Sequence, residues 1–338
     1  MHRATRLSAL TVIAVTALTA CSSGSDDATS STSSGSSDEL TTVSLRLDWT
    51  WGAEHTGYVV ADQLGYYADE GLDVQISEGE GSTVTATLVA NGDADLGVVS
   101  AGEVLSAVST DMPLQAVATV VQSSPTAIIY DEAAFDTAPT SLEDLYGHSL
   151  GVVTDSSTYK EWQALASLDG IDTSQIQEVA VGDAVVQSIL TGQVDAIVGW
   201  TFNQGLQVQT EGGDVGFLKF GDLGLDIPNS TIAANTDLIA SDPDLVSAFV
   251  RATAKGWEYT REHQDEALAM LFDAQPEIDV DYNTAKLPLV LELMGEADDF
   301  GAFDAESWQR LKDLYDEQGL LDSDVTLDGQ VYTTDLLG

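Results

Sequence analysis

Apolar and polar residues follow two different periods along the chain, and their alternation predicts strands and helices in turn. Residues 42–49 alternate apolar and polar positions, which is the pattern of a strand with one buried face. Residues 57–71 carry apolar side chains at helical spacing and end in a glycine, which predicts a helix. The same reasoning predicts a strand at 72–76, a helix at 82–92, a strand at 94–100, a helix at 101–110 and a strand at 114–121.

The alternation continues further along the chain and then gives way to a mainly helical part after Ser230. Strands that alternate with helices favour parallel sheets with helical crossovers, so we expect an α/β fold. The further elements are strands at 148–154, 176–181 and 194–200, helices at 158–171 and 183–193, and late helices at 242–271 and 305–321.

Two segments of the chain resemble each other. Residues 84–100 and 185–200 each contain a helix, a turn with glycine, an Asp-Ala pair and an apolar strand. The match is too short for a solenoid repeat. It indicates two similar α/β lobes.

The first 21 residues have the pattern of an export signal. A basic start precedes an apolar run over 7–20, which is too short for a comfortable membrane span. The run ends in Leu18-Thr19-Ala20-Cys21, which resembles a bacterial lipobox. We therefore expect a signal peptide at 1–20, a lipid on Cys21 and a flexible Ser/Gly-rich linker over 21–39. The protein would then be held at the outer side of the membrane by its lipid anchor alone.

The charge balance narrows the possible partners. The 338 residues include 56 Asp and Glu but only 11 Lys and Arg, a formal net charge of −45. Such a surface repels phosphate backbones, which excludes nucleic acid as a partner. The surplus fits adaptation to high salt, where screening removes the self-repulsion; an acidic secreted protein is the simpler alternative. Because Cys21 is the single cysteine, no intramolecular disulfide can form.

The sequence lacks the signatures of common catalytic and metal sites. The four histidines are scattered, and no Cys, His and carboxylate set has the spacing of a metal site. No nucleophile elbow, Walker loop or complete Rossmann fingerprint is present. Residues 322–329 resemble a calcium loop only loosely, as chance allows in so acidic a chain. We expect no catalytic residue, no metal and no cofactor.

Polar and aromatic residues gather where the predicted strands end. Ligands of open α/β sheets bind beyond the carboxyl ends of the strands, so these residues are candidates for a small, flat ligand. The candidates are Asp48, Trp49, Trp51, His55, Gly81, Ser82, Ser100, Glu103, Gln122, Ser156, Ser157, Thr158, Tyr159, Trp200, Asn203 and Gln204.

Several of these candidates also have a plain structural alternative. A tryptophan at a strand end commonly fills a core, and a histidine at the head of a helix can simply cap it. Residues 156–158 could cap the following helix, and Glu103 could be an ordinary acid of a first helical turn. Trp257 and Trp308 lie at helical spacing among apolar residues, so we expect them in the core.

The stretch from Leu45 to Val74 resembles the start of the NMT1/THI5-like family of substrate-binding proteins, and the similarity extends to the C-terminus. Later segments that resemble the family include 88–100 and 188–199. The matching residues are Leu47, Asp48, Trp49, Thr50, His55, Thr56, Gly57, Gly65, Tyr66, Tyr67, Glu70, Gly71, Leu72, Asp73 and Val74.

The resemblance implies a periplasmic-binding-protein type II fold, with two lobes joined by two crossover strands that close on a ligand. Its lobes would comprise residues 40–130 plus 230–338, and residues 131–229. It implies the capture subunit of an ABC importer, a monomer whose partners are a permease and an ATPase. The branch with Asp48-Trp49 resembles proteins that bind thiamine-precursor pyrimidines such as hydroxymethylpyrimidine or formylaminopyrimidine. Trp49 would stack on the ring, and Asp48 or His55 would meet its substituents.

Two departures from the family pattern leave other ligands open. Trp51-Gly52 stands where the family has Pro-Asn, and Asn203-Gln204 stands where Asn-Glu is common. Both changes favour another flat heterocycle such as riboflavin, while a sulfonate is disfavoured by the lack of basic residues at the strand ends other than Lys160. The family also includes pyrimidine synthases, which rely on a lysine and a cysteine-rich segment that this chain lacks, so we expect no enzyme.

Overall fold

The computed structural model describes residues 40–154 and 156–337. The expected signal peptide at 1–20, the lipidated Cys21 and the linker over 21–39 lie outside the described residues. No helix within the described part of the chain is long and apolar enough to span a membrane.

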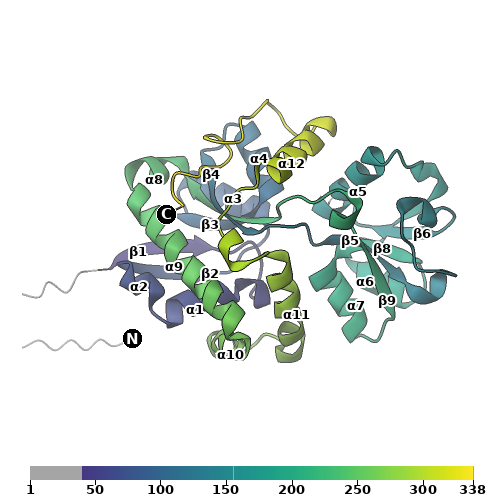
Figure 1. The fold of residues 1–338 in the computed structure, drawn as a ribbon, viewed down its shortest axis with the longest axis horizontal. Coiled ribbons are helices and arrows are strands. Elements are labelled where there is room, and N and C mark those ends of the chain that lie inside the picture. The colour runs from purple at the N-terminus through teal and green to yellow at the C-terminus, as the bar shows by residue number, and fades with distance from the viewer. Residues whose placement is uncertain (1–39, 155, 338) are drawn as a thin grey trace, which may run out of the picture. The chain divides into compact units, whose positions relative to one another are not determined.

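The first lobe is built on a five-stranded sheet with the order β2-β1-β3-β10-β4 (Figure 1). Strands β1 to β3 are parallel, and β10 runs antiparallel between β3 and β4. The strands are β1 Thr41–Arg46, β2 Leu72–Ser77, β3 Leu96–Ser100, β4 Leu114–Val121 and β10 Ser230–Asn235. The sequence pattern predicted the first four but missed β10. The part after Ser230 is mainly helical, as expected, with β10 as its one strand among the described residues.

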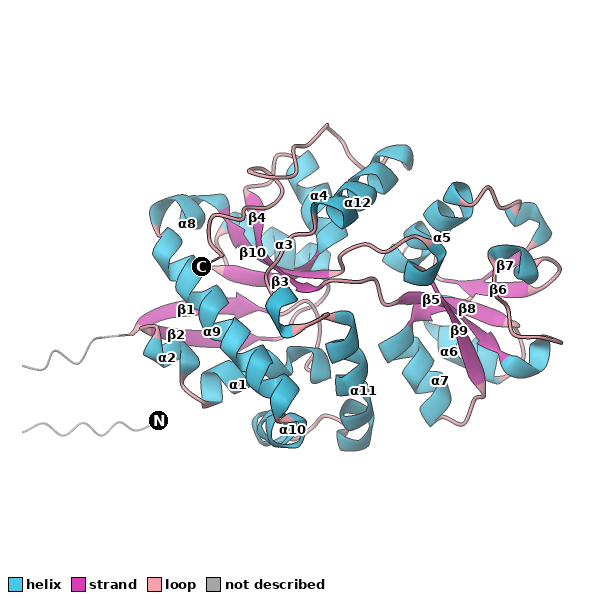
Figure 2. Cartoon of the chain, in the orientation of Figure 1, coloured by secondary structure: helices cyan, strands magenta, loops and turns pink. Residues whose placement is uncertain are grey.

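Helices cover both faces of this first sheet (Figure 2). The inward side chains of β1 pack with α1 and α9 in one apolar core, which includes Leu45, Val59 and Trp257. The helices are α1 Thr56–Gln63, α2 Tyr66–Asp69, α3 Ser82–Asn91, α4 Ala101–Ser109, α8 Thr236–Ser241, α9 Pro243–Glu262, α10 Gln264–Ala274, α11 Val280–Leu293 and α12 Ala305–Glu317.

The second lobe repeats the plan with a sheet of order β7-β6-β8-β5-β9. Strands β6, β7 and β8 are parallel, and β5 runs antiparallel between β8 and β9. The strands are β5 Thr126–Asp131, β6 Ser149–Val152, β7 Gln177–Ala180, β8 Ala196–Trp200 and β9 Val215–Lys219, with helices α5 Ser157–Leu168, α6 Val185–Leu190 and α7 Leu206–Thr210. The α/β fold with two lobes is therefore confirmed.

The chain crosses between the two sheets twice. The first crossing joins β4 to β5 through residues 122–125, and the second joins β9 to β10 through residues 220–229. Because β5 pairs with β8 and β9, it belongs to the second sheet. This pairing moves the first boundary from residue 130, as expected from the sequence, to residues 122–125.

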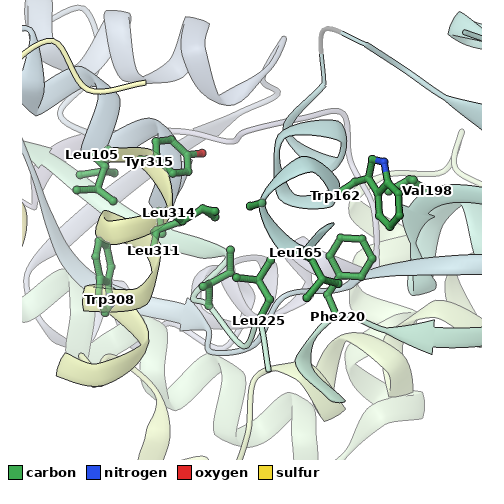
Figure 3. Packing of buried hydrophobic residues seen from close by; sticks show 14 of the residues in the cluster. Leu105, Trp162, Leu165, Val198, Phe220, Leu225, Trp308, Leu311, Leu314 and Tyr315 are labelled. Carbon is green, nitrogen blue, oxygen red and sulfur yellow. The ribbon is translucent and has the colours of Figure 1, made fainter. Parts of the chain in front are cut away.

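The late helix α12 packs beside the crossings and joins side chains of both lobes in one cluster. Figure 3 shows Trp308, Leu311 and Tyr315 of α12 in the same cluster as residues of the second lobe. Arg310 Nε donates to the carbonyl of Asp226 at 3.0 Å, and Gln318 Nε2 donates to the carbonyl of Lys160 at 2.8 Å. Trp257 and Trp308 are buried, which confirms their expected place in the core.

Candidate functional site

The loop after β1 carries the first group of candidates and is locked to the loop after β2. The amides of Gly81 and Gly79 donate to the carbonyls of Asp48 at 2.8 Å and Trp49 at 3.0 Å. A Cβ at position 79 would lie 2.0 Å from the carbonyl oxygen of Leu47, so only glycine permits this approach. The backbone therefore fixes where Asp48 and Trp49 stand.

Asp48 and His55 form a pair at the end of this loop. His55 Nε2 lies 3.0 Å from Asp48 Oδ1, and the imidazole is only 1% exposed. Its Nδ1 is buried without a hydrogen-bond partner among the described residues. The buried ring holds one oxygen of a partly exposed carboxylate, so Asp48 keeps acceptor capacity for a ligand.

Two tryptophans flank this carboxylate. Trp49 is 56% exposed, an unusual place for so large an apolar ring, whereas Trp51 is half-buried. Trp51 meets the His55 ring edge-on, with 6.1 Å between ring centroids and an interplanar angle of 90°. Trp49 therefore does not fill the core, and its face is free to stack on a flat ligand.

Three candidates lie together beyond the ends of β2 and β3 and are linked by hydrogen bonds within the protein: Ser82, Ser100 and Glu103. Ser82 Oγ accepts from the amide of Ser100 at 3.0 Å, and Ser100 Oγ accepts from the amide of Glu103 at 3.4 Å as the N-cap of α4. Ser100 is thus a helix cap, and Glu103 lies in the first turn of α4, as its structural alternative expected.

Gln122 lies in the first crossing, and its amide group is engaged within the first lobe. Its Nε2 lies 2.6 Å from the carbonyl oxygen of Asp299 and 3.3 Å from those of Thr119 and Ala302. Gln122 thus anchors the crossing to the segment after α11.

The candidates at the head of α5 form a capping group. Ser156 Oγ accepts from the amide of Tyr159 at 3.2 Å and donates to the carbonyl of Val153 at 2.7 Å. It also lies 2.8 Å from Thr158 Oγ1. The Tyr159 hydroxyl donates to Glu178 at 3.0 Å, and the side chain of Ser157 lies outside what the structure describes.

The candidates after β8 lie in a π-helical turn, η6, Thr201–Gly205. Gln204 Oε1 accepts from the amide of Trp200 at 2.9 Å, and Asn203 Oδ1 accepts from the Tyr282 hydroxyl at 3.0 Å. The indole N–H of Trp200 is buried without a partner among the described residues. The carbonyl oxygens of both amide side chains are therefore used, and their NH₂ groups are the donors that remain.

Four residues near these segments escaped the sequence analysis. Asn283 Oδ1 accepts from the amide of Ala53 at 2.8 Å, and Lys286 pairs with Glu54 at 2.7 Å. With Tyr282, these residues connect the loop after β1 to α11 and α11 to η6. The only local signal was a helix start at Asp279, the N-cap of α11, which says nothing about partners more than 200 residues away in the sequence.

Two further observations concern the described residues outside these candidates. They contain no group of three or more His, Cys, Asp or Glu side chains that could hold a metal. An open hollow of about 420 Å³ is lined by residues of α6, α7 and the start of β9, including Gln187, Glu211 and Asp214. Since β9 runs parallel to β8, this hollow lies at the opposite end of the second sheet from Trp200.

Comparisons with known proteins agree with this architecture. The chain is 31% identical to the formylaminopyrimidine-binding protein of Halalkalibacterium halodurans over 85% of this chain and 88% of that protein. It is 28% identical to the 4-amino-5-hydroxymethyl-2-methylpyrimidine phosphate synthase of Legionella pneumophila, over 70% and 74% of the two chains. It is 26% identical to the riboflavin-binding protein RibY of Chloroflexus aurantiacus, over 88% and 86%.

A solved structure shows the same fold at low sequence identity. The aliphatic sulphonate binding protein SsuA of Escherichia coli superimposes with a TM-score of 0.70 at 17% identity, covering 86% of this chain and 97% of that chain. The family model described as NMT1/THI5 like matches residues 52–267. The chain therefore belongs to the NMT1/THI5-like family and has a periplasmic-binding-protein fold.

Proposed function

We propose that this protein is the extracytoplasmic binding subunit of an ABC importer that captures a thiamine-precursor pyrimidine between its two lobes. Support comes from the two-lobed fold and from the similarity to a formylaminopyrimidine-binding protein. In this proposal the protein is a monomer anchored through a lipid on Cys21, and its partners are a permease and an ATPase. Ligand-driven closure offers the permease a changed surface through differential affinity for the closed state.

The observation that carries the ligand assignment is the carboxylate of Asp48, held by His55 beside the exposed ring of Trp49. An aminopyrimidine offers N–H donors at its edge and a flat ring. A carboxylate accepts from such donors through charge-assisted bonds, and an indole face stacks on the ring. These two contacts are of the kind that the ligand's chemistry requires.

Electrostatics support a neutral or weakly basic ligand over a sulfonate. Lys286, a buried ammonium near these segments, is already neutralised by Glu54 at 2.7 Å. The chain's net charge of −45 adds a repulsive field for any anion. That charge also supports a high-salt habitat as part of the proposal, so binding is best measured in molar salt.

A binding role is also favoured over catalysis. The synthases of this family, as the sequence resemblance implies, use a lysine and a cysteine-rich segment. This chain has a single cysteine, Cys21, and no lysine in residues 88–97. The proposal is therefore a binding protein without enzymatic activity.

Riboflavin is the second candidate ligand. The similarity to RibY supports it, and so does the second tryptophan, Trp51, which widens the aromatic surface beside Asp48. A flavin has three fused rings and needs a larger site than a single pyrimidine ring. One binding panel that contains both ligands therefore distinguishes the two candidates.

The test is isothermal titration and thermal shift of the purified protein in molar salt against hydroxymethylpyrimidine, formylaminopyrimidine, thiamine, riboflavin, taurine and nitrate. Saturation at a thousand times Kd stabilises the folded state by about 4 kcal/mol. We expect stabilisation by a pyrimidine and weaker binding in Trp49→Ala. Stabilisation by riboflavin alone would replace the ligand assignment, and a response to taurine alone would contradict it.

A further inference from the structure

Helix α11 belongs to the first lobe but packs against both ligand-facing segments. It contacts the short helix η1, Ala53–His55, in the first lobe, and η6 and α7 in the second lobe. In Figure 1 it stands between the two sheets, beside α7. A change in the separation of the lobes would therefore alter the contacts of α11 with η6 and α7.

Lys286 lies at the middle of this contact and is only 5% exposed. Its Nζ donates to Glu54 Oε1 at 2.7 Å. A buried ion pair is costly to desolvate, and removing one partner leaves an uncompensated charge. Glu54 directly precedes His55, so this pair fixes the helical turn that carries the partner of Asp48.

The same ammonium also faces two aromatic rings, one of which belongs to the second lobe. Lys286 Nζ lies 5.3 Å from the centroid of Phe202 in η6 and 5.8 Å from that of Tyr282 in α11. Cation–π attraction strengthens when the cation is desolvated. The buried ammonium therefore attracts a carboxylate of one lobe and a ring of the other.

A hydrogen bond runs beside this contact. The Tyr282 hydroxyl donates to Asn203 Oδ1 at 3.0 Å. Burial, and then the charge of Glu54, raise the pKa of Tyr282 to about 12, so the phenol keeps its proton and remains a donor at neutral pH. This bond also joins α11 to η6.

Gly52 makes room for the carboxylate of this pair. A Cβ at position 52 would lie 2.3 Å from Glu54 Oε2. A residue with a side chain at this position would require the Glu54 carboxylate to shift. The glycine that departs from the family pattern thus has a local role in this chain.

We propose that Lys286 is a positioning residue that braces the Trp51–His55 segment of the first lobe against η6 of the second. Through Glu54 on one side and Phe202 on the other, it holds the two ligand-facing segments at a defined separation before ligand arrives. The inference rests on the proposed capture of a ligand between the lobes. Preorganisation of this kind increases affinity because less freedom is lost on binding.

The direct test measures the separation of the lobes without ligand. In a full-length chain whose single cysteine is removed by Cys21→Ser, spin labels are placed through Glu258→Cys on α9 and Gln177→Cys on β7. Both positions are exposed, one on each lobe. We expect one narrow distance distribution in this parent and a broader or shifted one after Lys286→Met.

Binding provides the second arm. With hydroxymethylpyrimidine and formylaminopyrimidine as probes, we expect Lys286→Met to raise Kd about tenfold, within the range of coupling between linked sites. Lys286→Arg keeps the cation and its aromatic contact, so it should largely restore both readouts.

A matched control comes from Lys219, which forms an exposed pair with Glu292 between the same two lobes at 3.3 Å. Lys219→Met removes the same charge from the same pair of lobes, but exposed pairs contribute little. It should leave the distances unchanged and change Kd by less than about twofold.

Two further variants address the case in which Lys286→Met does not fold. Glu54→Gln with Lys286→Met removes both charges of the pair, and Gly52→Ala shifts the carboxylate alone. Both should broaden the distance distribution. An unchanged distribution in every folded variant, or tighter binding, would overturn the brace. A parent that binds neither pyrimidine would refute the proposed ligand, while the distance arm would still decide on Lys286.

Discussion

The two lobes share a pair of residues, one serine and one aspartate, in the same arrangement. In the first lobe, the amide and hydroxyl of Ser44 donate to Asp95 Oδ2 at 2.8 and 2.6 Å, and the amide of Asp95 donates back to Ser44 Oγ at 2.9 Å. In the second lobe, Ser149 and Asp195 form the same three bonds at 2.8, 2.8 and 2.9 Å. Each pair stands directly before the residues at which two parallel strands begin to pair, β1 with β3 and β6 with β8. The similarity of residues 84–100 and 185–200 therefore extends to atomic contacts.

The lobes differ at the opposite ends of these strands. After β3, Ser100 caps the regular helix α4, whereas after β8 the chain enters the π-helical turn η6. π-turns are rare and gather at functional sites. The first lobe leaves Asp48 and Trp49 accessible, while η6 ties its side-chain carbonyls to Trp200 and Tyr282. If the proposed function holds, recognition is concentrated in the first lobe, and the second lobe supplies donor groups and the Phe202 ring that the Lys286 brace contacts.

The largest expected effect follows from Asp48→Asn in the first lobe. The change keeps shape but removes the charge, and a hydrogen bond to a charged group contributes about 1.5–3 kcal/mol. We expect the Kd for the preferred pyrimidine to rise about tenfold to a hundredfold. Calorimetric titration measures it, with the exposed Asp73→Asn as control. Equal affinities of parent and Asp48→Asn would reverse the division of roles between the lobes.

A smaller effect is expected from breaking the two Ser–Asp pairs separately. Ser44→Ala and Ser149→Ala each remove a donor and an acceptor, so each should lower the free energy of unfolding by about 1–2 kcal/mol. Because the distances nearly coincide, the two losses should agree within about 0.5 kcal/mol. Urea denaturation monitored by tryptophan fluorescence measures both losses. Clearly different losses would show that the two pairs contribute differently to stability in spite of their matching geometry.

Gln204→Ala tests the second lobe more gently. The change leaves the amide of Trp200 without its acceptor and should cost about 1 kcal/mol of stability. We expect Kd to change only a few-fold, below the effect of Asp48→Asn. A loss of affinity as large as that of Asp48→Asn, with stability unchanged, would instead make Gln204 a primary ligand contact.

The smallest expected effects distinguish the lobes by pH. In the first lobe, hydrogen bonding to Arg251 and then Lys255 lowers the pKa of Glu70. The stabilisation by this pair is present above the ordinary carboxyl pKa and is lost as pH falls. The partners are half exposed, so the contribution at neutral pH is below about 1 kcal/mol.

In the second lobe the sign is opposite. Burial raises the pKa of Glu161, whose Oε2 accepts from the hydroxyl of Ser124 in the first crossing at 2.8 Å. The native state then holds the proton more tightly than the unfolded chain, so stability falls as pH rises above the ordinary carboxyl pKa. The free energy of unfolding of the variants Glu161→Gln and Glu70→Gln can be measured by denaturation across pH. Relative to the parent, we expect that of Glu161→Gln to increase as pH rises and that of Glu70→Gln to increase as pH falls. If the stabilities of the two variants depended on pH in the same way, the expected difference between the lobes would be contradicted.

The sequence predicted features that depend on local pattern. The alternation of strands and helices and the burial of Trp257 and Trp308 follow from periodicity, which reports what each segment buries. The helix expected over 57–71 is in fact α1 and α2, separated at Gly65, whose φ of 78° ends α1.

Features that depend on distant partners could not be predicted in this way. Residues 230–235 read as a strand only because β3 and β4, more than 100 residues earlier, leave a place between them. Lys286 is one lysine in an amphipathic helix until its partners Glu54 and Phe202 are known. Periodicity carries no information on such contacts.

The central position of β10 has a consequence for the order of folding. The second lobe is one continuous segment from β5 to β9 and can fold as soon as it is made. The first sheet cannot close until Ser230–Asn235 arrives, because β10 separates β3 from β4. The nascent first lobe therefore waits, with the edges of β3 and β4 unpaired, while the second lobe emerges. Unpaired strand edges are prone to aggregation. We therefore expect the nascent chain to depend most on chaperones between the synthesis of β4 and that of β10.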